Sequence, residues 1–294
     1  MTHQQHLKGT GVALITPFHQ NGTVDYDALE KLVIHVIRGG VDFLVALGTT
    51  AETSTLTSVE RQEVFSAVLR FADGQVPVIC GISGNNTEEV LQQIKDMDIR
   101  GAEAILSVAP YYNKPTQEGI YQHFKAIAAA TNKPVILYNV PGRTGSNILP
   151  ATVIRLAKDC TNIVGIKEAS GNIPQCLELL QAKPDNFTVL SGDDNLVLAQ
   201  MAIGMEGIVS VAANCFTKEI TDIVNLAIVG KFDKARKVLY KILPGIDLLF
   251  TEGNPAGVKA VLSELGMCEN VLRLPLTPVS EATATKIKEF MASR

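Results

Sequence analysis

The sequence contains no tryptophan, and aromatic residues make up only 5% of its 294 residues. Few aromatic rings are therefore available to stack on nucleic acid bases. The formal net charge is −4 at pH 7, so the chain has no excess of positive charge with which to bind a phosphate backbone. No apolar run reaches the ~18 residues that a membrane-spanning helix requires. We expect a protein that binds neither nucleic acid nor membrane.

Cysteine is also scarce, with five residues, an odd number, and no Cys-x-x-Cys spacing. This usage argues against a disulfide framework and favours a reducing compartment. The first ten residues are polar and lack the apolar stretch of a secretory signal. We therefore expect a cytoplasmic location.

Several motifs that bind cofactors are missing. The sequence has neither the Gly-rich phosphate loop nor the Gly-x-Gly-x-x-Gly turn that holds dinucleotides. It also lacks His-Glu-x-x-His, and its histidines are scattered. Asp193–Asp194 follows an apolar run and is able to bind a divalent cation, but we expect this pair to cap the next helix. The sequence predicts neither a metal nor an organic cofactor.

Apolar residues make up 46% of the chain. They are arranged in short runs that alternate with amphipathic segments. Each run ends in Gly, Pro, Asn, Ser or Thr, and continuous apolar runs of this length are typical of buried parallel strands. Helical patterns of about 10–15 residues lie between them, which indicates parallel βαβ units. Eight such units predict a closed (β/α)₈ TIM barrel. The runs are Val12–Ile15, Phe43–Leu47, Val76–Gly81, Ala104–Ala109, Val135–Tyr138, Ile163–Lys167, Thr188–Ser191 and Gly207–Val211.

The pattern changes after the eighth run. Residues 218–294 read as helical throughout, with breaks expected at Pro244, at Pro255 and across 274–278. We therefore predict a barrel over residues 1–217 that carries the active site. Residues 218–294 are expected to form C-terminal helices, including the last barrel helix, that pack on the barrel.

Lys167 is the most informative residue at a predicted strand end, where active sites of such barrels lie. Strand alternation places Lys167 on one face with Ile163 and Gly165. If that face lines the barrel, burial lowers the pKa of the amine and leaves a neutral nucleophile for a carbonyl carbon. Taken alone, such a residue is more often a lysine that reaches solvent.

Other polar side chains occupy neighbouring strand ends. Tyr138 is placed to exchange protons with an adduct on the lysine, or simply to pack at the rim. Thr49 and Thr50 can hold a carboxylate or cap a helix. Arg143, in a Pro-Gly-Arg-Thr-Gly loop, can bind a substrate carboxylate or remain in solvent. Each residue alone leaves both interpretations open.

Four ordered motifs together resemble the pyruvate-dependent N-acetylneuraminate lyase family. The resemblance covers nearly the whole chain and extends to Asn254–Lys259 in the helical tail. It implies a TIM barrel that forms a Schiff base with pyruvate and needs no cofactor, because the lysine imine itself accepts electrons. The motifs are Gly-Thr-Thr-Ala-Glu (48–52), Pro-Tyr-Tyr-Asn (110–113), Tyr-Asn-Val-Pro-Gly-Arg-Thr-Gly (138–145) and Val-Gly-Ile-Lys-Glu (164–168).

The resemblance also implies a role for each matched residue. Lys167 carries the imine, and the backbone at Val209 binds the pyruvate carboxylate together with Thr50. Arg143 binds the second substrate, L-aspartate 4-semialdehyde, and neuraminate lyases tend to lack this arginine. The resemblance also implies a proton relay through the hydroxyls of Tyr138, Thr49 and Tyr112. In this relay Tyr112 reaches into the active site of a neighbouring subunit.

The family usually assembles as a homotetramer made of two tight dimers, and we expect the same here. In lysine-inhibited relatives an allosteric site lies at the dimer interface, and Asn85, Glu89 and Tyr111 match it. Ser58 and Arg61 stand where such relatives often carry histidines, so we expect lysine inhibition to be weak or absent.

The chain departs from the usual family motif at two positions, and two alternative functions stay open. Ala51 and Thr53 replace the usual glycine and serine around the motif's glutamate. The first alternative is another pyruvate-dependent aldolase of the same family that acts on a sugar acid or keto acid. The second is a non-catalytic barrel that binds keto acids, although such binding gives the lysine, tyrosine and threonine set no evident purpose.

Overall fold

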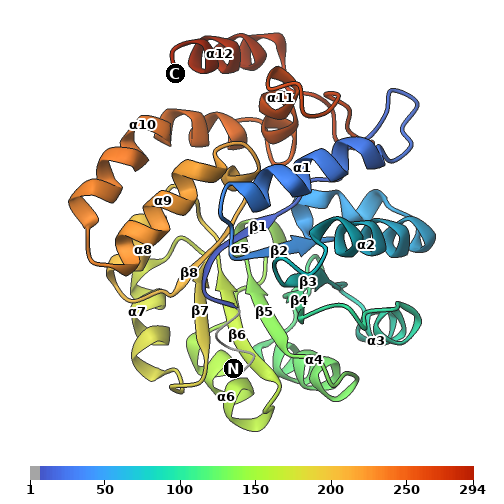
Figure 1. The fold of residues 1–294 in the computed structure, drawn as a ribbon. Helices are drawn as coiled ribbons and strands as arrows, with labels where there is room; N and C mark the ends of the chain where they lie inside the picture. The colour runs from blue at the N-terminus through green and yellow to red at the C-terminus, as the bar shows by residue number, and fades with distance from the viewer. Residues whose placement is uncertain (1–6) are drawn as a thin grey trace.

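The computed structural model describes residues 7–294, in which eight parallel strands close into a barrel in the order β1 to β8 (Figure 1). The predicted TIM barrel with a helical extension is confirmed. Helices cover the outside of the strands, and α10, α11 and α12 lie together at one edge of the molecule. The strands are β1 (Gly9–Ala13), β2 (Phe43–Ala46), β3 (Val78–Gly81), β4 (Ala104–Val108), β5 (Val135–Asn139), β6 (Ile163–Glu168), β7 (Thr188–Ser191) and β8 (Gly207–Ser210).

Within residues 7–294, six helices have a polar N-cap residue whose side chain accepts a backbone hydrogen bond. Asp25 caps α1, and Thr57 with Glu60 forms a capping box at α2. The α-helices are α1 (Tyr26–Arg38), α2 (Ser58–Ala72), α3 (Thr87–Asp96), α4 (Gln117–Ala129), α5 (Pro141–Thr144), α6 (Pro150–Asp159), α7 (Ile173–Ala182), α8 (Val197–Ala202), α9 (Thr217–Ile228), α10 (Phe232–Phe250), α11 (Ala256–Glu264) and α12 (Glu281–Ala292). Short 3₁₀ turns are η2 (Thr49–Ala51), η3 (Thr53–Thr55) and η4 (Ala212–Asn214).

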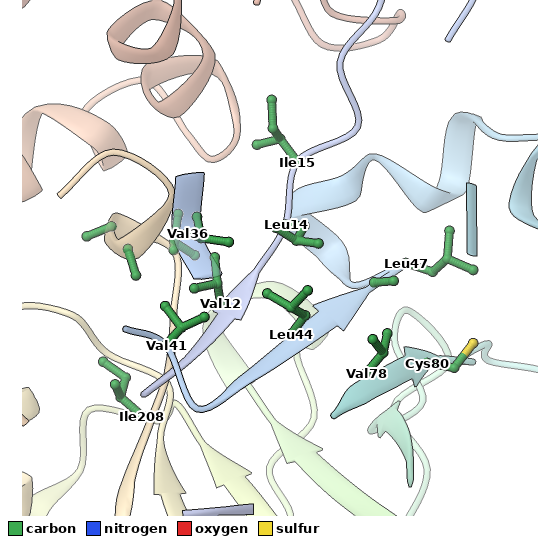
Figure 2. Packing of buried hydrophobic residues seen from close by; sticks show 14 of the residues in the cluster. Val12, Leu14, Ile15, Val36, Val41, Leu44, Leu47, Val78, Cys80 and Ile208 are labelled. Carbon is green, nitrogen blue, oxygen red and sulfur yellow. The ribbon is translucent and has the colours of Figure 1, made fainter. Parts of the chain in front are cut away.

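Strand alternation divides the buried side chains into two layers. Outward-facing residues pack against the helices, and Figure 2 shows three of them, Val12, Leu44 and Val78, with Val36 of α1. Inward-facing residues form a separate cluster that fills the barrel. The inner cluster comprises Leu7, Ala13, Phe43, Val45, Ile79, Ala104, Leu106, Ile136, Tyr138, Val140, Leu190 and Val209.

The first strand begins three residues earlier than predicted, because its initial Gly-Thr-Gly gives no apolar signal. Gly9 pairs with Gly207 and Gly11 with Phe43, so both residues belong to the closed sheet. A Cβ atom on Gly11 would lie 2.0 Å from Cε2 of the Phe43 ring. Glycine is therefore required here by close packing against the neighbouring strand.

The sixth strand contains an irregularity that the alternation argument missed. Val135 pairs with Ile163, but Ile136 pairs with Gly165, so the register shifts by one residue. Ile163 joins the outer cluster, while Val164 packs against the inner one. The prediction that Ile163 shares a face with Lys167 is wrong, because a bulge reverses the alternation before the lysine.

The C-terminal region is helical as predicted, but Pro244 does not end a helix. It lies inside α10, where burial of Ile242, Ile246 and Leu249 on one face stabilises a helix that lacks one backbone hydrogen bond. Interruptions do occur around Pro255 and across 274–278.

Helix α9 contacts both β1 and β8 and takes the place of the last barrel helix. Helices α10 to α12 form the extension beyond it. The division into 1–217 and 218–294 stays a prediction, and residues 1–6 lie outside the described part. Within residues 7–294, no helix is long and apolar enough to cross a membrane.

Candidate active site

Lys167 lies near the carboxyl end of β6 and points into the barrel. Its side chain is only 4% exposed, and its register partner on β5 is Tyr138. Because paired residues of neighbouring strands face the same side, the two side chains meet. The Lys167 Nζ lies 4.2 Å from the centroid of the Tyr138 ring. Among the described residues, no carboxylate forms a salt bridge with this amine.

Two adjoining cavities open above this pair. The deeper, about 200 Å³, is lined by Lys167, Thr50 and Asp193. The outer, about 290 Å³, widens beyond them toward Tyr111. Residues common to both cavities are Gly48, Thr49, Leu106, Tyr138, Val140 and Arg143. The lysine therefore lies at the bottom of a funnel large enough for small organic acids.

The Thr49–Thr50 turn follows β2 after Leu47 and Gly48. Leu47 and Glu52 adopt left-handed φ values of 59° and 53°, so the turn is bracketed by two strained residues. The Thr50 hydroxyl is buried and accepts a hydrogen bond from Asn254 Nδ2 at 2.9 Å. The side chain of Thr49 is exposed within the cavity wall. Neither threonine caps a helix, which removes the simplest alternative to a binding role.

Arg143 stands at the mouth of the funnel on the short helix α5. Its guanidinium is exposed, and its Nη2 donates to the backbone oxygen of Asn254 at 3.4 Å. Among the described residues, no carboxylate neutralises it. A cation in this position is free to bind a substrate carboxylate.

Two other predicted residues, Val209 and Tyr112, line neither cavity. Val209 faces the barrel interior, but the deep cavity reaches Val211 on the same strand end. Tyr112 is 88% exposed and lines neither cavity in the single chain. Asn85 Nδ2 donates to the backbone oxygen of Tyr111 at 3.2 Å, whereas Glu89 accepts from Asn86.

The prediction that Asp193–Asp194 caps the next helix is wrong, because α8 has Leu196 at its N-cap position and no side-chain capping hydrogen bond. Asp194 lies in the loop after β7. Its buried carboxylate accepts from the Ser210 hydroxyl and from the backbone N–H groups of Val211 and Ala212, at 3.0 and 3.1 Å. It thereby ties the end of β7 to the end of β8. Burial raises the pKa of Asp194, and these hydrogen bonds partly offset that rise.

Asp193 lines the cavity beside Lys167, a position that sequence reasoning did not assign to it. Burial raises its pKa, against the opposing effects of a hydrogen bond from Gln200 and of the Lys167 charge. The described residues contain no group of three or more His, Cys, Asp and Glu able to hold a metal ion.

A buried polar network lies on the outer side of β5 and β6. The Glu168 carboxylate accepts from Asn139 Nδ2 at 3.0 Å and from the backbone N–H of Ser170 at 2.8 Å. Burial raises the pKa of Glu168, partly offset by these bonds. Asn139 also accepts from the backbone N–H of Ile148 at 2.9 Å. The network thus anchors the far end of the loop that carries Arg143.

The arrangement suits carbonyl chemistry. A buried primary amine can attack a ketone, and the adjacent phenol of Tyr138 can move protons to and from the adduct. The hydroxyl of Thr50 and the guanidinium of Arg143 lie at different depths of the same funnel. They can therefore hold two separate carboxylates.

Comparison with known proteins gives a consistent picture. The sequence model of the dihydrodipicolinate synthetase family matches residues 6–293. A protein from Azobacteroides pseudotrichonymphae named 4-hydroxy-tetrahydrodipicolinate synthase is 52% identical, over 97% of this chain and 96% of that protein. A protein of the same name from Parabacteroides distasonis is 48% identical, also over 97% and 96%.

Solved structures agree. Dihydrodipicolinate synthase from Aquifex aeolicus superposes with a TM-score of 0.94 at 40% identity, covering 98% of each chain. A chloride-inhibited dihydrodipicolinate synthase from Acinetobacter baumannii, complexed with pyruvate, gives 0.94 at 42% identity, covering 97% of this chain and 98% of that one. The chain therefore belongs to the dihydrodipicolinate synthetase family.

Proposed function

We propose that this protein condenses pyruvate with L-aspartate 4-semialdehyde to give 4-hydroxy-tetrahydrodipicolinate, a step toward lysine and diaminopimelate. One observation carries the proposal most directly: the Lys167 amine lies buried at the bottom of a funnel, against the Tyr138 ring. The names of the relatives point to the same reaction.

The first half of the reaction uses pyruvate alone. Lys167 attacks the ketone carbon, and loss of water gives a protonated imine whose positive nitrogen withdraws electrons. The pyruvate methyl group then loses a proton and leaves an enamine. Thr50 and the backbone at Val209 bind the pyruvate carboxylate. Protons move through Tyr138, Thr49 and Tyr112 of the partner subunit.

The second half adds the aldehyde. Arg143 binds the carboxylate of L-aspartate 4-semialdehyde, which aims the aldehyde carbon at the enamine. The new carbon–carbon bond regenerates an imine on Lys167, and the aldehyde oxygen takes a proton to become a hydroxyl. The substrate's own amine then attacks the imine carbon, which closes the ring and releases the lysine.

We further propose a homotetramer made of two dimers, in the cytoplasm. Tyr112 supports the assembly, because an aromatic side chain that is 88% exposed and held at a left-handed φ of 71° is suited to an interface. Cysteines that are all free thiols fit a reducing compartment.

A panel of aldehydes tests the proposed substrate. With pyruvate present, L-aspartate 4-semialdehyde should be consumed much faster than an uncharged aldehyde of similar size. Arg143→Ala should lower kcat/KM for the semialdehyde roughly 10- to 100-fold, because a charge-assisted hydrogen-bond pair is lost. It should hardly affect the uncharged aldehyde or the KM for pyruvate.

Other outcomes assign other functions. Preference for a sugar-acid or keto-acid aldehyde would identify a different aldolase of the family. Pyruvate binding without turnover of any aldehyde would identify a binding barrel. An Arg143→Ala variant with unchanged selectivity would remove the proposed role of the guanidinium.

Lysine should inhibit this enzyme weakly or not at all. Ser58 is too short to replace an imidazole, and Arg61 is already engaged with the Thr53 backbone oxygen at 3.2 Å and with Gln93 at 3.4 Å. Initial rates measured against increasing L-lysine, at a pyruvate concentration near its KM, would check this. Half-inhibition well below millimolar lysine would contradict it.

A further inference from the structure

A fully buried ion pair links the C-terminal extension to the barrel. Lys259 Nζ on α11 lies 2.5 Å from the Glu52 carboxylate, and both side chains are 0% exposed. Removing two charges from water is costly, and apolar residues of similar size often stabilise a fold equally well. Burial lowers the pKa of Lys259, and the Glu52 charge only partly offsets that fall. The pair therefore calls for an explanation other than stability.

The position of Glu52 suggests that explanation. It directly follows the η2 turn that carries Thr49 and Thr50, and its own backbone is held at a φ of 53°. A non-glycine residue keeps such a conformation only where the surroundings impose it. Here the second carboxylate oxygen accepts from the backbone N–H of Arg273 at 3.0 Å, so the extension contacts Glu52 from two sides.

The lysine is itself held in place. Lys259 donates to the backbone oxygen of Val271 at 2.8 Å and lies 4.1 Å from the centroid of the Phe18 ring. The Arg273 guanidinium, stacked on the same ring, binds the Glu60 carboxylate and the backbone oxygen of Thr55. The segment after the turn is thus held by Lys259 on α11 and by Arg273, which comes from beyond α11.

The same extension reaches the cavity directly. Asn254, just before α11, donates through Nδ2 to the Thr50 hydroxyl at 2.9 Å, and its backbone oxygen accepts from Arg143. Two polar contacts therefore attach the turn to α11 and the residues just before it: Thr50 to Asn254, and Glu52 to Lys259. A shift of α11 relative to the barrel would move the Thr50 hydroxyl within the cavity.

We propose that Glu52 and Lys259 are positioning residues whose ion pair fixes the Thr49–Thr50 turn against the pyruvate end of the cavity. Neither side chain lines the cavity, so their effect passes through the turn. This inference rests on the proposed function, because it assigns Thr50 to the pyruvate carboxylate. Without the pair, pyruvate binding should weaken while Lys167 and Tyr138 keep their own contacts.

The test uses the full-length protein and five variants, of which three alter the ion pair by removing one or both charges. Glu52→Gln and Lys259→Met each leave one buried charge unpaired, so either variant can fail to fold. The double variant E52Q/K259M removes both charges and keeps similar side-chain volumes, which preserves a foldable core. Its KM for pyruvate should rise roughly 10- to 100-fold, the order expected for displacement of a binding group by about 1 Å.

One further measurement and two control variants separate positioning of the Thr49–Thr50 turn from a general loss of stability. At saturating pyruvate, borohydride should still attach reduced pyruvate to Lys167 of the double variant, because the amine is unchanged. Ile287 is buried in α12, away from the turn. Ile287→Val should therefore lower the melting temperature without altering the KM for pyruvate. Glu52→Asp, which keeps the charge, should show a smaller rise in KM than the double variant.

Each result decides a separate question. An unchanged KM for pyruvate in a folded double variant would overturn the positioning role. A wild-type protein that forms no adduct with pyruvate would instead overturn the proposed function on which the inference rests.

Discussion

Replacing Lys167 with methionine is expected to lower kcat by at least ~10³-fold, because the nucleophile that forms the imine is lost. The protein should still fold, since Lys167 faces a cavity and makes no salt bridge with a described residue. Methionine fills a similar volume without a charge. Steady-state kinetics and thermal melting would measure both effects.

A matched control separates the loss of this amine from the loss of any amine. Lys288, in an exposed ion pair with Glu264, is far from the funnel, and Lys288→Met should leave kcat and KM unchanged. A Lys167→Met variant that folds and keeps more than a few per cent of wild-type activity would exclude a lysine imine as the route.

Removing the Tyr138 hydroxyl should have the second-largest effect. Tyr138→Phe keeps the ring that Lys167 Nζ approaches at 4.2 Å but removes the group that moves protons. General acid–base groups typically contribute 10²–10⁴-fold, so we expect kcat to fall by about that factor. The KM for pyruvate should change little, because the phenol acts on the adduct and not on the pyruvate carboxylate.

Pre-steady-state trapping gives a more specific readout for the same variant. Quenching with borohydride at increasing times should show slower adduct formation in Tyr138→Phe than in wild type, with the same final extent. Adduct formation at the wild-type rate would place the phenol outside imine formation. Its role would then be confined to later steps or to packing.

The barrel could be predicted because its signals are local. Continuous apolar runs, each followed by a turn and a helix start, mark the strands of a sheet covered on its outer face by helices. The predictions of strand bounds and register were wrong where contacts between segments distant in sequence outweigh the local residue pattern. Gly9 and Gly11 belong to β1 because they pair with Gly207 of β8 and Phe43 of β2, and no apolar run in the local sequence indicates this pairing.

Two further errors have similar causes. The bulge in β6 is defined by pairing with β5, and nothing between Ile163 and Gly165 reveals a shift of register. Pro244 looks like a helix breaker, yet burial of one face of α10 outweighs a single lost hydrogen bond. In each case tertiary contacts decide the outcome, and the local pattern does not contain them.

The site shows the same division. Lys167 and Tyr138 could be identified because catalytic residues of such barrels sit at strand ends. Asn254 could not, since it contacts Thr50 across 204 positions of sequence. Asp194 was misassigned because an acidic residue before a helix is usually a cap, whereas here its partners lie on β8.

The most direct test of the whole account is borohydride reduction of the wild-type protein in the presence of pyruvate, followed by intact and peptide mass spectrometry. We predict one stable adduct of reduced pyruvate per chain, located on the peptide that contains Lys167 and absent from Lys167→Met. A folded wild-type protein that forms no adduct, or an adduct on another lysine, would contradict the Schiff-base mechanism.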